Sequence, residues 1–144
     1  MSHARQQIRD LFVSTLTGGT DAGARVYNSR IYPYSTLPSI NVTTPTEVID
    51  DEVFGGKQLR HLTVEVECLV KGNASYASDL DTIAAQVETL IGADVTLGNR
   101  VKDTEYQRMR VSFDGGQDEI VGVLSIEYLV WYLVNKADPT TLLT

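Results

Sequence analysis

The sequence is poor in the residues that build metal sites and disulfides, since its 144 residues include one cysteine and two histidines. Cys68 has no second cysteine with which to form a disulfide within the chain, and we expect it to be a small buried side chain of a strand. His3 and His61 are far apart, and the H-x-x-x-H spacing that places two zinc ligands on one helix face does not occur. We therefore expect no metal ion and no cofactor.

Basic residues and long apolar runs are also scarce. The 12 Lys and Arg residues are outnumbered by 19 Asp and Glu residues, which gives a formal net charge of −7. A general nucleic-acid-binding surface would need the opposite balance. The most apolar run, residues 119–135, contains Ser125 and Glu127 and is too short and polar for a membrane helix. The N-terminus lacks the apolar stretch of a signal peptide, so we expect no contact with a membrane.

Motifs of catalysis are absent as well. The glycine-rich residues 18–23 lack the Gly-Lys-Ser/Thr ending of a phosphate-binding loop and follow a predicted helix, so they are interpreted as the end of that helix. Neither histidine stands beside a recognisable nucleophile. The acidic groups at 50–52 and 114–119 lack the spacing of a calcium loop. We expect no catalytic residues, and the protein is predicted not to be an enzyme.

The longest apolar stretch, residues 119–135, predicts a strand because its side chains alternate between two faces. One face is apolar along its length, with Leu124, Ile126, Tyr128, Val130, Tyr132 and Val134. The other face has Ser125 and Glu127, which suit water, in its middle and ends with Leu129, Trp131 and Leu133. A strand end that is apolar on both faces is usually covered on both sides.

The sequence leaves open which of two elements packs over Leu129, Trp131 and Leu133. One is an element of the same chain, such as the segment 46–57 with its Val53 and Phe54. The other is a neighbouring subunit, because aromatic anchors are enriched at interfaces. We take Leu129, Trp131 and Leu133 as candidate subunit-interface residues.

Hydrophobic periodicity predicts an α+β fold. Apolar residues at helical spacing predict helices over residues 2–16, with Ser2 as the N-terminal cap, and over 75–92. Alternation predicts strands over 25–32, 39–43, 58–71, 101–113 and 119–135. We expect an antiparallel or mixed sheet of about four to five strands with both helices packed on one face. Residues 1–135 would form a single domain, and residues 136–144 a polar C-terminal tail.

The acidic segment 46–57 is either a loop or the outer end of a hairpin. Its glycines and acids favour a mobile loop over residues 46–56 that orders on assembly, whereas its apolar side chains favour docking to a partner. The partner-facing candidates are Val48, Ile49, Asp50, Asp51, Glu52, Val53 and Phe54.

Several stretches, taken in order, resemble the tail terminator family of long-tailed phages, of the lambda minor tail protein U type. They are Ile8-Arg9 in the first helix, residues 25–33 (RVYNSRIYP), residues 37–42 (LPSINV), Glu65-Val66-Glu67, the acidic amphipathic helix, Tyr106 with Arg108 and Arg110, and the aromatic final strand. The resemblance spans nearly the whole chain, and it is the order of the stretches that carries it. Residues 136–144 extend past the end expected for this family.

The resemblance implies a structural role in a virion. Members of the family are small α+β subunits that form a ring, here expected to be a hexamer, on the finished tail tube. The ring stops polymerisation of the tube and presents a surface for head–tail joining. The implied partners are further copies of the chain, the tail tube protein and a head–neck connector protein, with DNA passing through without specific binding. Other readings are another neck, head-closure or tail-completion subunit, or a monomeric module that binds a small ligand.

Overall fold

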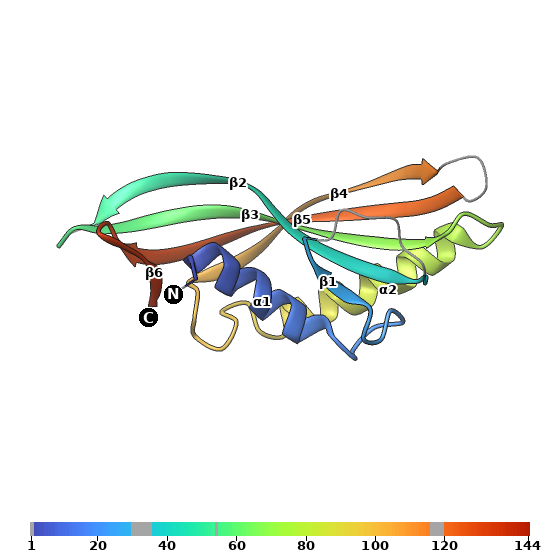
Figure 1. The fold of residues 1–144 in the computed structure, drawn as a ribbon, viewed down its shortest axis with the longest axis horizontal. Helices are drawn as coiled ribbons and strands as arrows, with labels where there is room; N and C mark the ends of the chain where they lie inside the picture. The colour runs from blue at the N-terminus through green and yellow to red at the C-terminus, as the bar shows by residue number, and fades with distance from the viewer. Residues whose placement is uncertain (1, 30–35, 54, 116–119) are drawn as a thin grey trace.

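A computed structural model describes residues 2–29, 36–53, 55–115 and 120–144 of the chain. It has two helices and one mixed, six-stranded sheet, which confirms the predicted α+β class (Figure 1). The helices are α1 (Ala4–Leu16) and α2 (Tyr76–Gly92). The strands are β1 (Val26–Asn28), β2 (Ser39–Val53), β3 (Lys57–Lys71), β4 (Asp103–Gly115), β5 (Ile120–Asn135) and β6 (Asp138–Leu143).

The sheet has the order β1-β2-β3-β5-β4, with β6 also pairing with β5. The pairing of β1 with β2 is parallel, and every other pairing is antiparallel. β3 pairs with β5 along its whole length, from Lys57 opposite Asn135 to Lys71 opposite Val121. The two strands with the clearest alternation in the sequence therefore form the centre of the sheet.

Both helices lie on the same side of the sheet, as expected (Figure 1). The core between helices and sheet includes Ile8 and Phe12 of α1 and Ile83 and Val87 of α2, all at most 1% exposed. The Phe12 ring lies 5.9 Å from the ring of Tyr128 on β5. Leu62, Val64 and Val66 of β3 line the same core, because every second residue of a strand points to one face.

Helix α1 begins two residues later than predicted, and its cap is His3 in place of Ser2. The His3 Nδ1 atom accepts a hydrogen bond from the Arg5 backbone N–H over 3.1 Å. This bond satisfies one of the donors that the first turn of a helix leaves unpaired. Burial, with the Arg5 charge as the second cause, lowers the pKa of His3 below its ordinary value. The neutral ring that can accept this bond is therefore favoured.

Of the two alternatives for the acidic segment, the structure shows the hairpin, and the loop expected over residues 46–56 is wrong for residues 46–53. They form the outer half of β2, which pairs with β3 from Thr46 opposite Thr63 to Val53 opposite Lys57. The hairpin closes through Gly55 and Gly56, whose φ angles of 81° and 74° suit glycine. Ladder hydrogen bonds to the regular strand β3 outweigh the low strand propensity of the acidic run. The short strand predicted at 39–43 is the first third of this longer one.

Residues 136–144, expected to be a polar tail, include β6, which pairs with the end of β5 beyond the start of β4. Leu142 of β6 joins the core at 9% exposure. The Gln7 side chain of α1 donates a hydrogen bond to the Thr140 carbonyl over 2.6 Å. The C-terminal segment thus supplies a sixth strand and fixes the start of α1.

Candidate functional site

Neither helix covers the second face of the sheet, which we call the open face (Figure 1). Leu129, Trp131 and Leu133 lie on it, each partly exposed, whereas the intervening Tyr128, Val130 and Tyr132 are buried in the core. The structure therefore separates the two apolar sets of β5 as the alternation predicted. Neither α1 nor α2, the two helices of the described residues, lies over the candidate interface residues (Figure 1).

The open face carries an apolar patch around Trp131. The indole stacks on the His61 ring of β3, with 4.2 Å between ring centroids and 24° between ring planes. Val48 of β2 is the register partner of His61, and His61 is the partner of Trp131, so the three residues form one row across the sheet. Leu59 lies opposite Leu133 beside this row. We call Val48, Leu59, His61, Leu129, Trp131 and Leu133 the open-face patch.

The segment proposed to face a partner lies in the plane of the sheet and does not fold over Trp131. Val48 and Ile49 are 63% and 51% exposed, so neither is used by the core. Asp50, Asp51, Glu52 and Val53 belong to the backbone of β2, and Phe54 lies outside the described residues. The segment is thus a strand with one exposed apolar pair, followed in the sequence by three acids.

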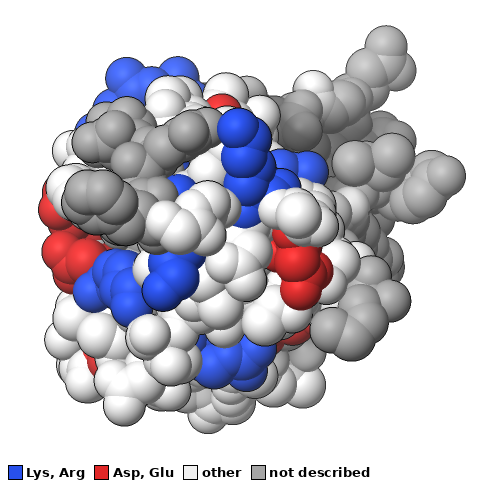
Figure 2. Space-filling view, turned by 90° about the vertical axis from the view of Figure 1, so that its left-hand side faces the viewer, with Lys and Arg blue, Asp and Glu red and all other residues white. Residues whose placement is uncertain are grey.

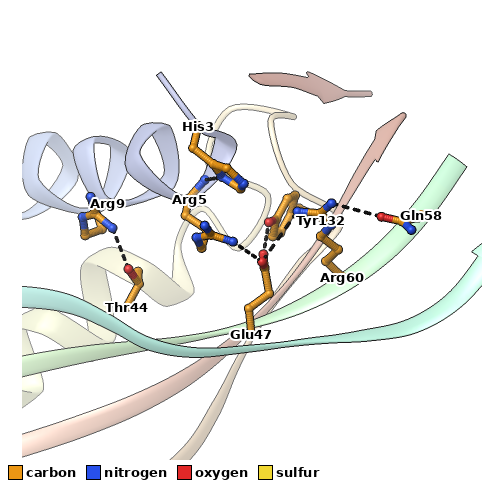
Figure 3. Close-up of polar contacts among 8 residues, drawn as sticks. All are labelled: His3, Arg5, Arg9, Thr44, Glu47, Gln58, Arg60 and Tyr132. Atoms are coloured by element: carbon orange, nitrogen blue, oxygen red, sulfur yellow. Dashed lines mark hydrogen bonds and ion pairs between the residues drawn. The ribbon is translucent and has the colours of Figure 1, made fainter. Parts of the chain in front are cut away.

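A charged cluster centred on Glu47 lies on the helix side of β2 (Figure 3). No motif of the sequence predicted it. The Glu47 carboxylate pairs with Arg5 of α1 and accepts a hydrogen bond from the hydroxyl of Tyr132, a fully buried residue. Arg60 Nη1 lies 3.6 Å from Glu47 Oε2, and Arg60 Nη2 donates to Gln58 Oε1 over 3.0 Å.

The cluster joins elements that are distant in the sequence. The side chains of Glu47 and Arg60 are only 12% and 11% exposed, so their charges need each other to offset desolvation. Arg9 Nη1 donates to Thr44 Oγ1 over 2.6 Å one turn further along α1 (Figure 3). The cluster has no nucleophile and is interpreted as the clamp that holds the start of α1 on β2.

Strand β4 is an edge of the sheet and exposes an apolar row on its helix side. The row is Tyr106, Met109, Val111 and Phe113, each between 44% and 55% exposed. Met109, Val111 and Phe113 share a face, as the alternation of the strand predicted over residues 101–113 implies. They are not core residues, however, because the core between α2 and the sheet does not extend under the edge strand. Only Phe113 meets α2 in a ring contact, 4.9 Å from Tyr76.

The described residues offer no obvious site for a metal ion or for catalysis. Among them, no group of three or more His, Cys, Asp or Glu side chains could hold a metal ion. An open hollow of about 430 Å³ is lined by Asp21, Leu37, Pro38, Lys71, Asp79 and Ile83, among others. These side chains include no nucleophile paired with a base. In the same part of the chain, neither helix has the length and apolar character needed to cross a membrane.

The fold as a whole is similar to that of a chain in a solved structure described as the virion of a native gene transfer agent (GTA) particle. The similarity has a TM-score of 0.52 at 16% sequence identity and covers 90% of this chain and 92% of that chain. Neither a scan of protein-family models nor a search of curated proteins gives a match. At this identity the similarity shows a shared fold, which comprises nearly the whole of both chains.

Proposed function

We propose that the protein is a structural subunit of a phage-like virion and has no enzymatic activity. The observation that carries this proposal is the fold similarity over 90% of the chain to a chain of a gene transfer agent virion. The order of sequence stretches that resembles the tail terminator family supports a finer assignment. The protein would be a tail terminator, a ring expected to contain six copies that caps the tail tube and stops its polymerisation.

A ring of this kind has two kinds of partner besides its own copies. One side meets the tail tube protein, and the other presents the head–tail joining surface to a head–neck connector protein. The open-face patch supports a role in such contacts, because contiguous exposed apolar surface marks interaction sites. Leu129, Trp131 and Leu133 would lie in a subunit interface, and residues 48–54 would face a partner.

The charge of the protein suits a channel that DNA traverses without being held. The chain has a net charge of −7. At the end of the molecule where α1 begins, basic and acidic side chains of the described residues are interspersed (Figure 2). Tight binding of phosphates requires a concentrated basic field. DNA is therefore proposed to pass without specific binding.

Deletion of the gene from the genome that encodes it tests the proposal, with electron microscopy of the particles produced. A terminator should leave tail tubes of uncontrolled length, because nothing stops polymerisation. Tubes of normal length beside unjoined heads would instead indicate another neck or head-closure subunit. Normal, infectious particles, together with a purified protein that stays monomeric in native mass spectrometry, would refute a virion role and favour a small-ligand binding module.

A further inference from the structure

Within the described part of the chain, β4 and the outer half of β2 each have a side that no strand covers, and the two stretches differ in charge. Among the described residues, no backbone group pairs with the outer edge of β4 or with the outer edge of β2 beyond Val42. Open edges are sites at which another chain can add a strand. We propose that copies of this chain assemble head to tail, with the edge of β4 in one copy pairing with the outer half of β2 in the next. This inference rests on the proposed ring.

Strand direction favours this pairing. β2, β3, β5 and β4 alternate in direction across the sheet, because each neighbouring pair is antiparallel. β4 therefore runs opposite to β2 of the same copy. When a second copy is placed beside the first in the same orientation, its β2 runs antiparallel to the first copy's β4. The alternation then continues across the junction, in the pairing that is the more stable per residue.

Charge selects the unlike edges over the like ones. The middle of β4, residues 106–113, contains Arg108 and Arg110 and no acid, whereas residues 48–53 of β2 contain three acids, Asp50, Asp51 and Glu52, and no base. Arg108 Nε already lies 2.6 Å from Glu127 Oε2, but no described carboxylate pairs with Arg110. A twofold β4–β4 contact would bring the arginines of two copies together, and like charges opposite each other are destabilising.

Exposed apolar side chains lie along both edges. β4 offers the row from Tyr106 to Phe113, and β2 offers Val48 and Ile49. Pairing of the edges would remove part of both sets from water, which supplies the favourable free energy that surface charges alone do not. Because the two edges are different surfaces of one chain, the contact is heterologous, and repetition with a closing rotation produces a ring.

Charge reversal in two separate variants tests the pairing. The first variant carries Arg108→Gln and Arg110→Glu, and the second carries Asp51→Lys and Glu52→Lys. Self-association is measured by sedimentation velocity and native mass spectrometry up to the highest soluble concentration. The association of each variant alone should be weaker than that of the wild type, by a factor of up to about ten. An equimolar mixture should recover association, because each acidic edge then meets a basic one.

The controls separate this inference from the proposed function. Lys71→Glu, on a strand with neighbours on both sides, should leave association unchanged, and circular dichroism should show that all variants are folded. A wild type that stays monomeric, or a mixture that fails to recover, would overturn the edge pairing. If the variants form wild-type rings and control tube length normally, the terminator proposal stands and only the edge pairing is refuted. If the gene deletion also leaves particles unchanged, the edge pairing and the terminator proposal are both refuted.

Discussion

Replacing Trp131 by alanine is expected to weaken assembly more than it weakens the fold of the subunit. Trp131 is partly exposed on the open face, and its ring contact there is the stack on His61 at 4.2 Å. Loss of such a stack and of the partial burial should lower the free energy of unfolding of the isolated subunit by about 1–2 kcal/mol. Truncation of an interface anchor costs about 2 kcal/mol or more, which weakens association about 30-fold.

Ile126→Ala is the matched control, because Ile126 lies on the same strand but points into the core at 0% exposure. Its replacement should cost the isolated subunit about 2–5 kcal/mol through the cavity it leaves. Association of the molecules that remain folded should be little changed. Trp131→Ala is thus expected to act mainly on assembly, and Ile126→Ala mainly on folding.

The measurement requires two assays on the same preparations. Urea denaturation of dilute protein, followed by far-ultraviolet circular dichroism, gives the free energy of unfolding. Fluorescence cannot serve for Trp131→Ala, because Trp131 is the only tryptophan of the chain. Native mass spectrometry at high concentration gives the oligomer. If Trp131→Ala destabilises the subunit as much as Ile126→Ala while the oligomer persists, Trp131 belongs to the fold and the interface assignment is refuted.

Two further predictions concern the clamp at the start of α1. Glu47→Ala should lower the free energy of unfolding by about 3 kcal/mol, because Arg60 and Tyr132 lose their acceptor. The control Glu88→Ala, on the exposed face of α2, should change it by less than about 0.5 kcal/mol. Equal effects in urea denaturation would show that the clamp does not hold the fold together. His3→Ser should remove part of the loss of stability in acid. Because the pKa of His3 is lowered in the folded protein, the contribution of His3 to the free energy of unfolding is present above the unfolded pKa of about 6.5. It is lost as the pH falls through the folded pKa. Denaturation profiles of the wild type and His3→Ser that run parallel from pH 8 to pH 4 would contradict this role.

The central strands could be predicted from the sequence because burial and alternation coincide in them. In β3, Leu62, Val64 and Val66 are buried and the residues between them are partly exposed, so the period of two is visible in the residue types. The same reasoning separated the core face of β5 from Leu129, Trp131 and Leu133. It could not decide what covers those three, because that depends on where the helices pack.

The sequence could not decide between a loop and a hairpin for the outer half of β2, and it gave no indication of the strand β6, for a different reason. Their residue types, an acidic run and the sequence DPTTLL, have weak strand propensity, and their strand structure comes from ladder bonds to β3 and β5. The Glu47 cluster depends on contacts between residues 5, 47, 60 and 132, and no local pattern brings these together. Residues 109, 111 and 113 show the converse, since their alternation is regular but their exposure follows from β4 being an edge.

The features that protect the edges of this sheet also bear on how copies would assemble. Natural sheets discourage edge pairing with charges and with bulges. β4 has a register shift between Tyr106 and Arg108, and β2 has shifts at 43/46 and 49/51. Arg108 and Arg110 disfavour the pairing of the middle of β4 with another β4, and the acids at residues 50–52 disfavour the pairing of β2 with β2. The same charges attract each other when the middle of β4 meets the acidic part of β2. One set of charges would therefore both prevent the pairing of like edges and specify the head-to-tail contact. Whether such a contact closes into a ring or continues as a filament then depends only on the rotation between neighbouring copies.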